Sequence, residues 1–472
     1  MKIKINFVYD FVSLNGKMIN GINPIYTKKF FDNNFDAQNH NFNEKLKKEN
    51  DNKNFNFWLN TTLYEYGNNI EICVSNIKKI KPSELYFYPI STNGDLHEFV
   101  ADRQIKHKTS FFYISEKTKQ LLREKSNFFI YIEHKMEPDF KADNLKKIYD
   151  LCSENNIPFD KIFIINGSNS NKKTLDNFIE KYNVNTLPKL VSFNWSLGYK
   201  ALDLNVALGN RPSVGHDFLS TFADIEHINL KKKNKGLLLT RRLRLHRIIL
   251  LSMLFESSTI ENLLYSLDMN LNFFSNFKEI LNHEPETMDI DIEPQYKSKI
   301  LKGYDLMLRQ DKKIADYELL PYLSGLGRES KQLYEQTYFT IVQETMFSVW
   351  EQAFTEKVLQ PISHFHPFIV IGSPYTLKNL KEVGFKTFSG WWDESYDNEE
   401  DNWKRLIKVY RIIVDLCNKS DEQLHTMLIE MKDILEYNRN LLQKFNSIKH
   451  ENSITQILPD FFDYSKKIIK IL

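Results

Sequence analysis

The chain has 472 residues, of which 42% are hydrophobic and 14% aromatic, enough for globular cores and, by length, for two domains. Because 63 Lys and Arg residues nearly balance 61 Asp and Glu residues, no overall charge directs the chain to nucleic acid or an anionic membrane. Three separated cysteines, Cys73, Cys152 and Cys417, form neither a disulfide framework nor a zinc-site spacing and fit a reducing compartment. No segment reaches about 18 uninterrupted apolar residues, so we expect a cytoplasmic protein without a membrane span.

Strand and helix patterns alternate along the first half of the chain. Apolar runs predict strands at 2–9, 128–132, 161–165 and 189–195, and helical patterns cover 141–155 and 173–182. Residues 84–89 form another apolar-aromatic run. This alternation predicts a parallel sheet covered by helices. The pattern lapses from 211 to 235, which indicates a domain crossing. We therefore expect an N-terminal domain over residues 1–225.

A second alternation follows the crossing. Strands are predicted at 236–239, 338–342 and 368–371, and helices at 248–255, 273–281, 296–308, 401–416 and 421–445. This predicts a C-terminal domain over 226–445, followed by a helical extension over 446–472 with one helix at 454–472. The fold class we expect is α/β, with two Rossmann-like domains facing a cleft, the kind of place where ligands bind.

Basic residues follow the first strand of the second alternation, where a helix should begin. They are Arg241, Arg242, Arg244, His246 and Arg247. A helix N-terminus favours anions, and guanidinium groups form bidentate contacts with phosphate, so the cluster is a candidate phosphate site. The alternatives are a solvated basic loop and a nucleic-acid-binding patch.

A second candidate site surrounds the next predicted strand. Glu344 ends that strand, and Thr355, Glu356 and Lys357 stand where a helix should begin. Lys357 can offset the charge of a diphosphate, and a glutamate can accept both hydroxyls of a ribose or a sugar. The alternative is a helix cap formed by Thr355, with Glu356 in the first turn. Gly372 ends the following strand and is either close to a ligand or part of a plain connecting loop.

The stretch from 338 to 388 resembles a known family. Glu-Thr-x-Phe at 344–347, Thr-Glu-Lys at 355–357 and Leu-Lys-x-Leu-Lys-x-x-Gly-Phe-Lys-Thr-Phe at 377–388 are similar to the C-terminal half of GT-B-like glycosyltransferases of phages and bacteria. The Thr-Glu-Lys element resembles that of α-1,3-fucosyltransferases, in which Glu and Lys hold the ribose and phosphates of the donor nucleotide.

The resemblance implies roles for the two halves of the chain. The C-terminal half would bind the donor, with the arginine cluster as part of the site and the loop at Gly372 near the donor; the N-terminal half would bind the acceptor. The last helix often returns to the first domain in such folds. At the start of the arginine cluster this chain has Thr240, where the resembling proteins usually have Asn.

The function that we infer is transfer of a sugar from a nucleotide-diphosphate sugar to an acceptor hydroxyl of a polysaccharide, a protein or a modified DNA base. Two alternatives stay open: a non-catalytic GT-B-like binding or structural protein, and a nucleic-acid-binding protein that uses the 241–247 cluster.

An inverting enzyme of this kind needs a general base near the acceptor. Glu133 is the first candidate because it follows a predicted strand, at the edge of a parallel sheet where sites gather. Asp10 and the pair His216 and Asp217 are other candidates, and the alternative for each of these residues, Glu133 included, is a polar loop residue without a catalytic role.

The sequence contains no convincing Asp-x-Asp metal motif, so we expect a metal-independent reaction with no cofactor beyond the donor. Arginines and a lysine would stabilise the departing diphosphate. Asp393 and Glu394 are the first carboxylates to test if a metal is needed. His364 and His366 are predicted to be structural, hydrogen-bonded residues.

Overall fold

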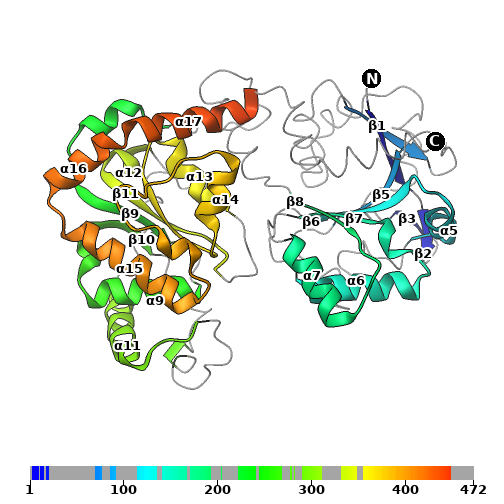
Figure 1. Ribbon diagram of the computed structural model, residues 1–472, viewed down its shortest axis with the longest axis horizontal. Coiled ribbons are helices and arrows are strands. Elements are labelled where there is room, and N and C mark those ends of the chain that lie inside the picture. The colour runs from blue at the N-terminus through cyan, green and yellow to red at the C-terminus, as the bar shows by residue number, and fades with distance from the viewer. Residues whose placement is uncertain are drawn as a thin grey trace. The chain divides into compact units, whose positions relative to one another are not determined.

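Two parallel β-sheets organise this computed structural model, a mixed α/β protein (Figure 1). The chain divides into two compact units, Met1–Trp195 with Ile448–Leu472, and Ser196–Ser447. The structure describes residues 3–9, 11–14, 17–20, 70–76, 85–91, 114–134, 141–166, 171–192, 204, 222–240, 244–267, 277–278, 281, 290–310, 331–347 and 354–447.

The first unit contains a six-stranded sheet with the order β4-β1-β5-β6-β7-β8, in which every pairing is parallel. Its strands are β1 (Ile3–Tyr9), β4 (Ile70–Asn76), β5 (Leu85–Ser91), β6 (Phe128–His134), β7 (Ile162–Asn166) and β8 (Lys189–Ser192). A separate antiparallel pair joins β2 (Phe11–Leu14) and β3 (Lys17–Asn20).

Three described helices cover one face of this sheet: α5 (Glu116–Glu124), α6 (Ala142–Glu154) and α7 (Asn171–Tyr182). Figure 1 shows α6 and α7 side by side against it. Strands β6 and β7 read FFIYIEH and IFIIN, the apolar runs typical of strands buried inside an α/β domain. The core formed with the helices includes Ile130, Ile164, Leu122, Leu145 and Phe178, all buried.

The second unit contains a four-stranded parallel sheet with the order β10-β9-β11-β12. Its strands are β9 (Asn234–Thr240), β10 (Leu263–Leu267), β11 (Thr337–Gln343) and β12 (Phe368–Ile371). The chain leaves β9 towards β10 on one side, whereas β11 lies on the other side of β9 and continues outwards to β12. The direction of winding therefore reverses between β9 and β11, and the carboxyl ends of these two strands form a topological switch point, where ligands of parallel sheets bind.

Helices cover both faces of the second sheet. They are α9 (Leu245–Glu256), α11 (Pro294–Leu308), α12 (Lys331–Glu335), α13 (Glu356–Ser363), α14 (Thr376–Val383), α15 (Asn402–Asn418), α16 (Asp421–Glu430) and α17 (Lys432–Ser447). Short 3₁₀ helices are η4 (Phe159–Lys161), η5 (Ile225–Asn229), η6 (Thr259–Asn262) and η9 (Ser395–Asn398). In Figure 1, α9 and α15 lie on one side of the sheet, and α13 and α17 on the other.

Helix α9 is the central helix of the second unit. It is buried from His246 to Phe255, because α11 and α15 cover the sides that the sheet does not. At the crossing with α11, a side chain at Gly303 would place its Cβ 1.8 Å from the carbonyl oxygen of Ser252. The close approach of the two helices therefore requires glycine at this position.

The strands and most of the helices predicted from the sequence are confirmed, with bounds that shift by a few residues. Strands β2, β3, β4 and β10 and helices α5 and α12 were not predicted, and β5 falls on the apolar-aromatic run at 84–89. The single helix predicted over 421–445 is wrong, because it divides at Met431 into α16 and α17. Of the helix predicted over 273–281, only 277–278 and 281 are described, and the helix predicted over 454–472 lies outside the described residues. The domain boundaries at 225 and 445 stay predictions.

Histidines join the segment before β9 to the amino end of the second sheet. His364 Nδ1 accepts a hydrogen bond from the main-chain N–H of Ala223 at 3.1 Å, and His227 Nε2 lies 3.0 Å from the carbonyl oxygen of His364. His366 bonds with the Thr340 hydroxyl at 2.8 Å. The structural role predicted for His364 and His366 is confirmed.

Burial, and next the charge of Lys232, lowers the pKa of His227 to about 4, and burial holds the pKa of His366 well below its usual value. Between pH 6.5 and 4 the unfolded chain therefore binds protons that the folded chain excludes, so acid favours unfolding. We expect His227 to contribute a loss of up to about 2 kcal/mol of unfolding free energy between pH 7.5 and pH 5. Urea unfolding at both pH values measures this loss.

The variant His227→Gln serves as the control, because it keeps a polar side chain that does not titrate. Its loss between the two pH values should be smaller than that of the wild type. An equal loss in both proteins would contradict the assignment.

Candidate functional site

The candidate site lies at the carboxyl edge of the second sheet, where the loops after β9, β11 and β12 begin. Thr240, Gln343 and Ile371 are the last residues of these strands. The residues predicted to bind the sugar-nucleotide donor come directly after these strand ends in the sequence. The parallel topology brings the three strand ends to one edge of the sheet.

Glu344 holds the start of helix α13. Its side chain is fully buried, and its two carboxylate oxygens accept hydrogen bonds from the main-chain N–H of Thr355 at 2.9 Å and from the Thr355 hydroxyl at 2.6 Å. Burial raises the pKa of Glu344, whereas the nearby charge of Lys357 and the bonds from Thr355 act in the opposite direction. In this structure Glu344 fixes the position of the Thr355–Lys357 segment.

Thr355 is the N-cap of α13, since its hydroxyl accepts a hydrogen bond from the main-chain N–H of Lys357 at 3.3 Å. The capping interpretation of this segment is therefore confirmed. Glu356 and Lys357 form an ion pair with 2.7 Å between Oε1 and Nζ, and their side chains are 14% and 34% exposed. The pair is partly open to solvent, so a ligand could still reach it while Thr355 caps the helix. The ligand-binding role of Glu356 and Lys357 stays a prediction.

The arginine cluster divides into exposed and buried parts. Arg244 is exposed and is the N-cap residue of α9, but its side chain makes no capping hydrogen bond with the first turn. Arg247 is 4% exposed, and its Nη2 donates to the carbonyl oxygens of Gln343 at 2.9 Å and Glu344 at 2.8 Å. Burial lowers the pKa of Arg247 to about 10, so the group remains charged at neutral pH. Arg241 and Arg242 lie outside the described residues.

A stack of three side chains ties the strand ends together. The His246 ring lies parallel to the Phe347 ring, with centroids 4.6 Å apart, and the Arg405 guanidinium lies 4.4 Å from the same Phe347 centroid. His246 Nε2 also lies 3.2 Å from the carbonyl oxygen of Glu344. Burial and the charge of Arg247 hold the pKa of His246 well below its usual value, so this ring is neutral at physiological pH.

Arg405 reaches the site from α15 and is 2% exposed. Its Nε donates to the carbonyl oxygen of Gly372 at 3.0 Å, its Nη2 donates to the carbonyl oxygen of Phe347, and its Nη1 donates to that of Glu399 at 2.7 Å. Burial lowers the pKa of Arg405 to about 10. One guanidinium therefore joins the loop after β11 to the loop after β12.

Gly372 allows the loops after β11 and β12 to approach closely. A Cβ added here would lie 3.3 Å from both the Cβ of Glu344 and the Oγ1 of Thr376. This close packing accounts for glycine at this position, and its nearness to a bound donor stays a prediction.

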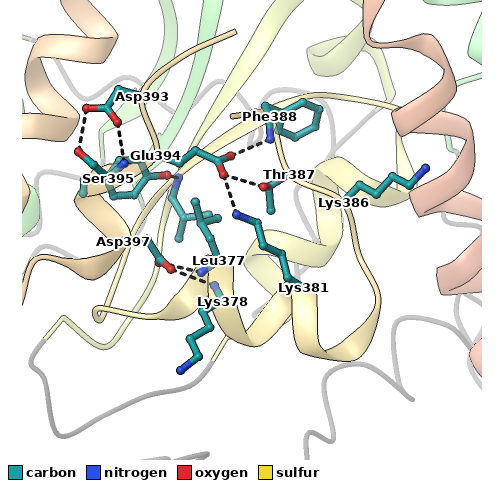
Figure 2. Close-up of polar contacts among 12 residues, drawn as sticks. Leu377, Lys378, Lys381, Lys386, Thr387, Phe388, Asp393, Glu394, Ser395 and Asp397 are labelled. Carbon is teal, nitrogen blue, oxygen red and sulfur yellow. Dashed lines mark hydrogen bonds and ion pairs between the residues drawn. The ribbon is translucent and has the colours of Figure 1, made fainter. Parts of the chain in front are cut away.

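The N-terminus of α14 already holds an anion of the protein itself. Figure 2 shows the Asp397 carboxylate against the first turn, where it accepts from the main-chain N–H groups of Leu377 at 2.8 Å and Lys378 at 2.9 Å. The N-terminus of α13 is likewise occupied by the Thr355 cap and the Glu344 carboxylate, whereas α9 has no side-chain cap, so a phosphate is better placed at the first turn of α9 than at α14.

Asp393 and Glu394 have local partners as well (Figure 2). Glu394 accepts from the main-chain N–H of Phe388 at 2.7 Å and from the Thr387 hydroxyl at 2.6 Å, and it pairs with Lys381 at 3.1 Å. Asp393 accepts from the main-chain N–H and the hydroxyl of Ser395. These carboxylates fix the loop between α14 and η9. Within the described residues, no three His, Cys, Asp or Glu side chains are grouped so that they could hold a metal ion.

Of the predicted catalytic candidates, Glu133 is the one whose backbone the structure describes, in the first unit. The backbone of Glu133 lies near the carboxyl end of β6, next to Ser91 of β5 and Ile165 of β7, whereas its side chain lies outside what the structure describes. Asp10, His216 and Asp217 are outside the described residues. No helix in the described part of the chain has the length and apolar character needed to cross a membrane.

Sequence reasoning missed Arg405 and Gln343, and it gave Phe347 no role beyond its place in the motif at 344–347. A signal for Arg405 exists, because it occupies the buried stripe of α15 with Val409, Ile412 and Leu416 at helical spacing. A charged residue in an apolar stripe indicates a buried polar network. Nothing in the sequence identifies its acceptors, which are main-chain carbonyls of distant loops.

No protein-family model and no curated protein matches this chain. Among solved structures it is similar to the N-terminal domain of Candida albicans trehalose-6-phosphate phosphatase, with 10% identity, 81% of this chain and 71% of that chain covered, and a TM-score of 0.34. It is also similar to an α,α-trehalose-phosphate synthase (UDP-forming) from Burkholderia vietnamiensis, with 8% identity, 99% and 98% covered, and a TM-score of 0.34. At these scores the similarities establish neither a fold family nor an activity for this chain.

We expect Arg405→Met to lower the unfolding free energy by about 2–4 kcal/mol, because it leaves buried carbonyl oxygens without their donor. Arg405→Lys should recover only part of the lost unfolding free energy, since an ammonium group cannot donate to several carbonyl oxygens in the planar geometry of a guanidinium. Urea unfolding of the full chain measures the unfolding free energy of both variants. Arg411→Met, at an exposed position of the same helix, is the control and should stay within about 0.5 kcal/mol of the wild type. Wild-type stability in Arg405→Met would contradict this role.

Proposed function

We propose that this chain is a GT-B-like glycosyltransferase whose C-terminal unit binds the nucleoside diphosphate of a sugar donor. The observation that carries the proposal is the switch point between β9 and β11. The first turn of α9, the exposed Arg244 and the partly exposed pair of Glu356 and Lys357 follow the two strands that flank it. Helix N-termini and cations at such a point suit a diphosphate.

The charges at this edge suit a reaction in which a diphosphate departs. Lys357 and Arg244 would contact it, and the buried Arg247 would add a fixed positive charge behind them. Such preorganised charges stabilise a leaving anion more strongly than water does. Glu356 would accept ribose or sugar hydroxyls, and Glu344 would keep the Thr355–Lys357 segment in place.

The first unit would supply the acceptor side, with Glu133 as the general base. The acceptor is a hydroxyl of a polysaccharide, a protein or a modified DNA base, and the reaction would proceed without a divalent metal and without a cofactor beyond the donor. The motif resemblance over 344–388 supports this assignment. The nucleic-acid-binding alternative needs exposed cations, and it is weakened by the burial of His246 and Arg247.

The proposal predicts release of nucleoside diphosphate from one member of a panel of sugar nucleotides, by transfer to an acceptor in a cell extract or by slow hydrolysis. Lys357→Ala should lower the rate roughly ten- to a hundred-fold, because a charged hydrogen bond to the diphosphate is lost. Addition of EDTA should leave the wild-type rate unchanged. Mass spectrometry of the products measures both.

The control variant is Lys404→Ala, which removes an exposed lysine of α15. It should keep the wild-type rate. Activity that EDTA abolishes and Mg²⁺ or Mn²⁺ restores would contradict the metal-free mechanism, and an unchanged rate in Lys357→Ala would remove Lys357 from the site.

A further inference from the structure

Thr240 and Gln343 form a buried pair between the two strands of the switch point. The parallel register pairs Leu237 of β9 with Thr340 of β11, so three residues further along each strand Thr240 lies beside Gln343. The Thr240 hydroxyl donates to Oε1 of Gln343 at 2.7 Å. The two residues are 1% and 4% exposed.

The amide nitrogen of Gln343 stands out in this pair. Nε2 is buried and has no hydrogen-bond partner among the residues that the structure describes, whereas Oε1 has Thr240. Native proteins leave few buried donors without an acceptor, because each costs free energy. A donor left open at a ligand-binding position is explained when the ligand brings the acceptor.

The surroundings select the chemistry of that ligand. Arg247, in the first turn of α9, donates to the carbonyl oxygen of Gln343 itself, and Arg244 is the N-cap residue of the same helix. A carboxamide N–H on the residue whose main-chain carbonyl Arg247 contacts, at the end of the strand beside this helix N-terminus, suits an anionic oxygen rather than another donor.

We propose that Nε2 of Gln343 donates a hydrogen bond to a diphosphate oxygen of the nucleotide, and that Thr240 orients the amide for this contact. The inference rests on the proposed function and adds a contact that lies outside the arginine cluster and the Thr355–Lys357 segment. It also gives Thr240 a role, because the Thr240 hydroxyl, at the start of the arginine cluster, holds the side-chain amide of Gln343 from the neighbouring strand.

The test is calorimetric titration with UDP, GDP and inorganic pyrophosphate. Gln343→Glu keeps the acceptor for Thr240 but replaces the donor by an anionic oxygen, so it should weaken nucleotide and pyrophosphate binding at least about ten-fold. Thr240→Val should also weaken binding, because the amide loses its orienting partner, and Thr240→Ser should restore it. Thermal unfolding of each variant, in parallel, verifies that it is folded.

Asn379→Asp is the matched control. Asn379 is a buried carboxamide whose Nδ2 also lacks a partner among the described residues, but it lies in helix α14 rather than at the end of strand β11. This variant should bind as the wild type does. Wild-type affinity in folded Gln343→Glu would overturn the inference, as would a loss seen with the nucleotides but not with pyrophosphate. A wild-type protein that binds no nucleoside diphosphate, whatever its base, would instead overturn the proposed function.

Discussion

Two buried guanidinium groups hold the carboxyl edge of the second sheet. Arg247 donates to carbonyl oxygens at the end of β11, and Arg405 donates to carbonyl oxygens of the loops after β11 and β12. A buried cation is costly unless acceptors surround it, and here main-chain oxygens are among them. Because those oxygens lie at the strand ends and in the loops, a movement of the loops would break hydrogen bonds to a buried guanidinium or expose it to solvent.

This constraint explains why residues far apart in the sequence act at one edge. With the loops fixed, Glu344 can bind Thr355, which caps α13 and holds the partly exposed pair of Glu356 and Lys357 in its first turn. Arg247 fixes α9 against the same strand end. Arg247 and Lys357 are therefore in place before any ligand arrives, as the proposed electrostatic stabilisation of a departing diphosphate requires.

Apolar runs predicted both parallel sheets, because buried strands need continuous hydrophobic residues whatever their partners are. The candidate residues Arg247, Glu344 and Thr355 were also found in sequence, and the cap at Thr355 followed from residue type alone. The burial of Arg247 and Glu344 could not be predicted, since it depends on how three loops pack. Arg405 and Gln343 were missed for the same reason. Their hydrogen-bond partners lie on other elements, and a local sequence pattern does not identify such distant partners.

The central claim is that a nucleoside diphosphate binds at the carboxyl ends of β9 and β11. Amide hydrogen exchange with and without the nucleotide that binds tests it most directly, because exchange reports local protection along the chain. The account predicts slower exchange in peptides covering 241–248 and 343–357, and unchanged exchange in peptides covering 222–233 at the opposite edge of the sheet. Protection confined to 222–233, or to the first unit, would contradict it.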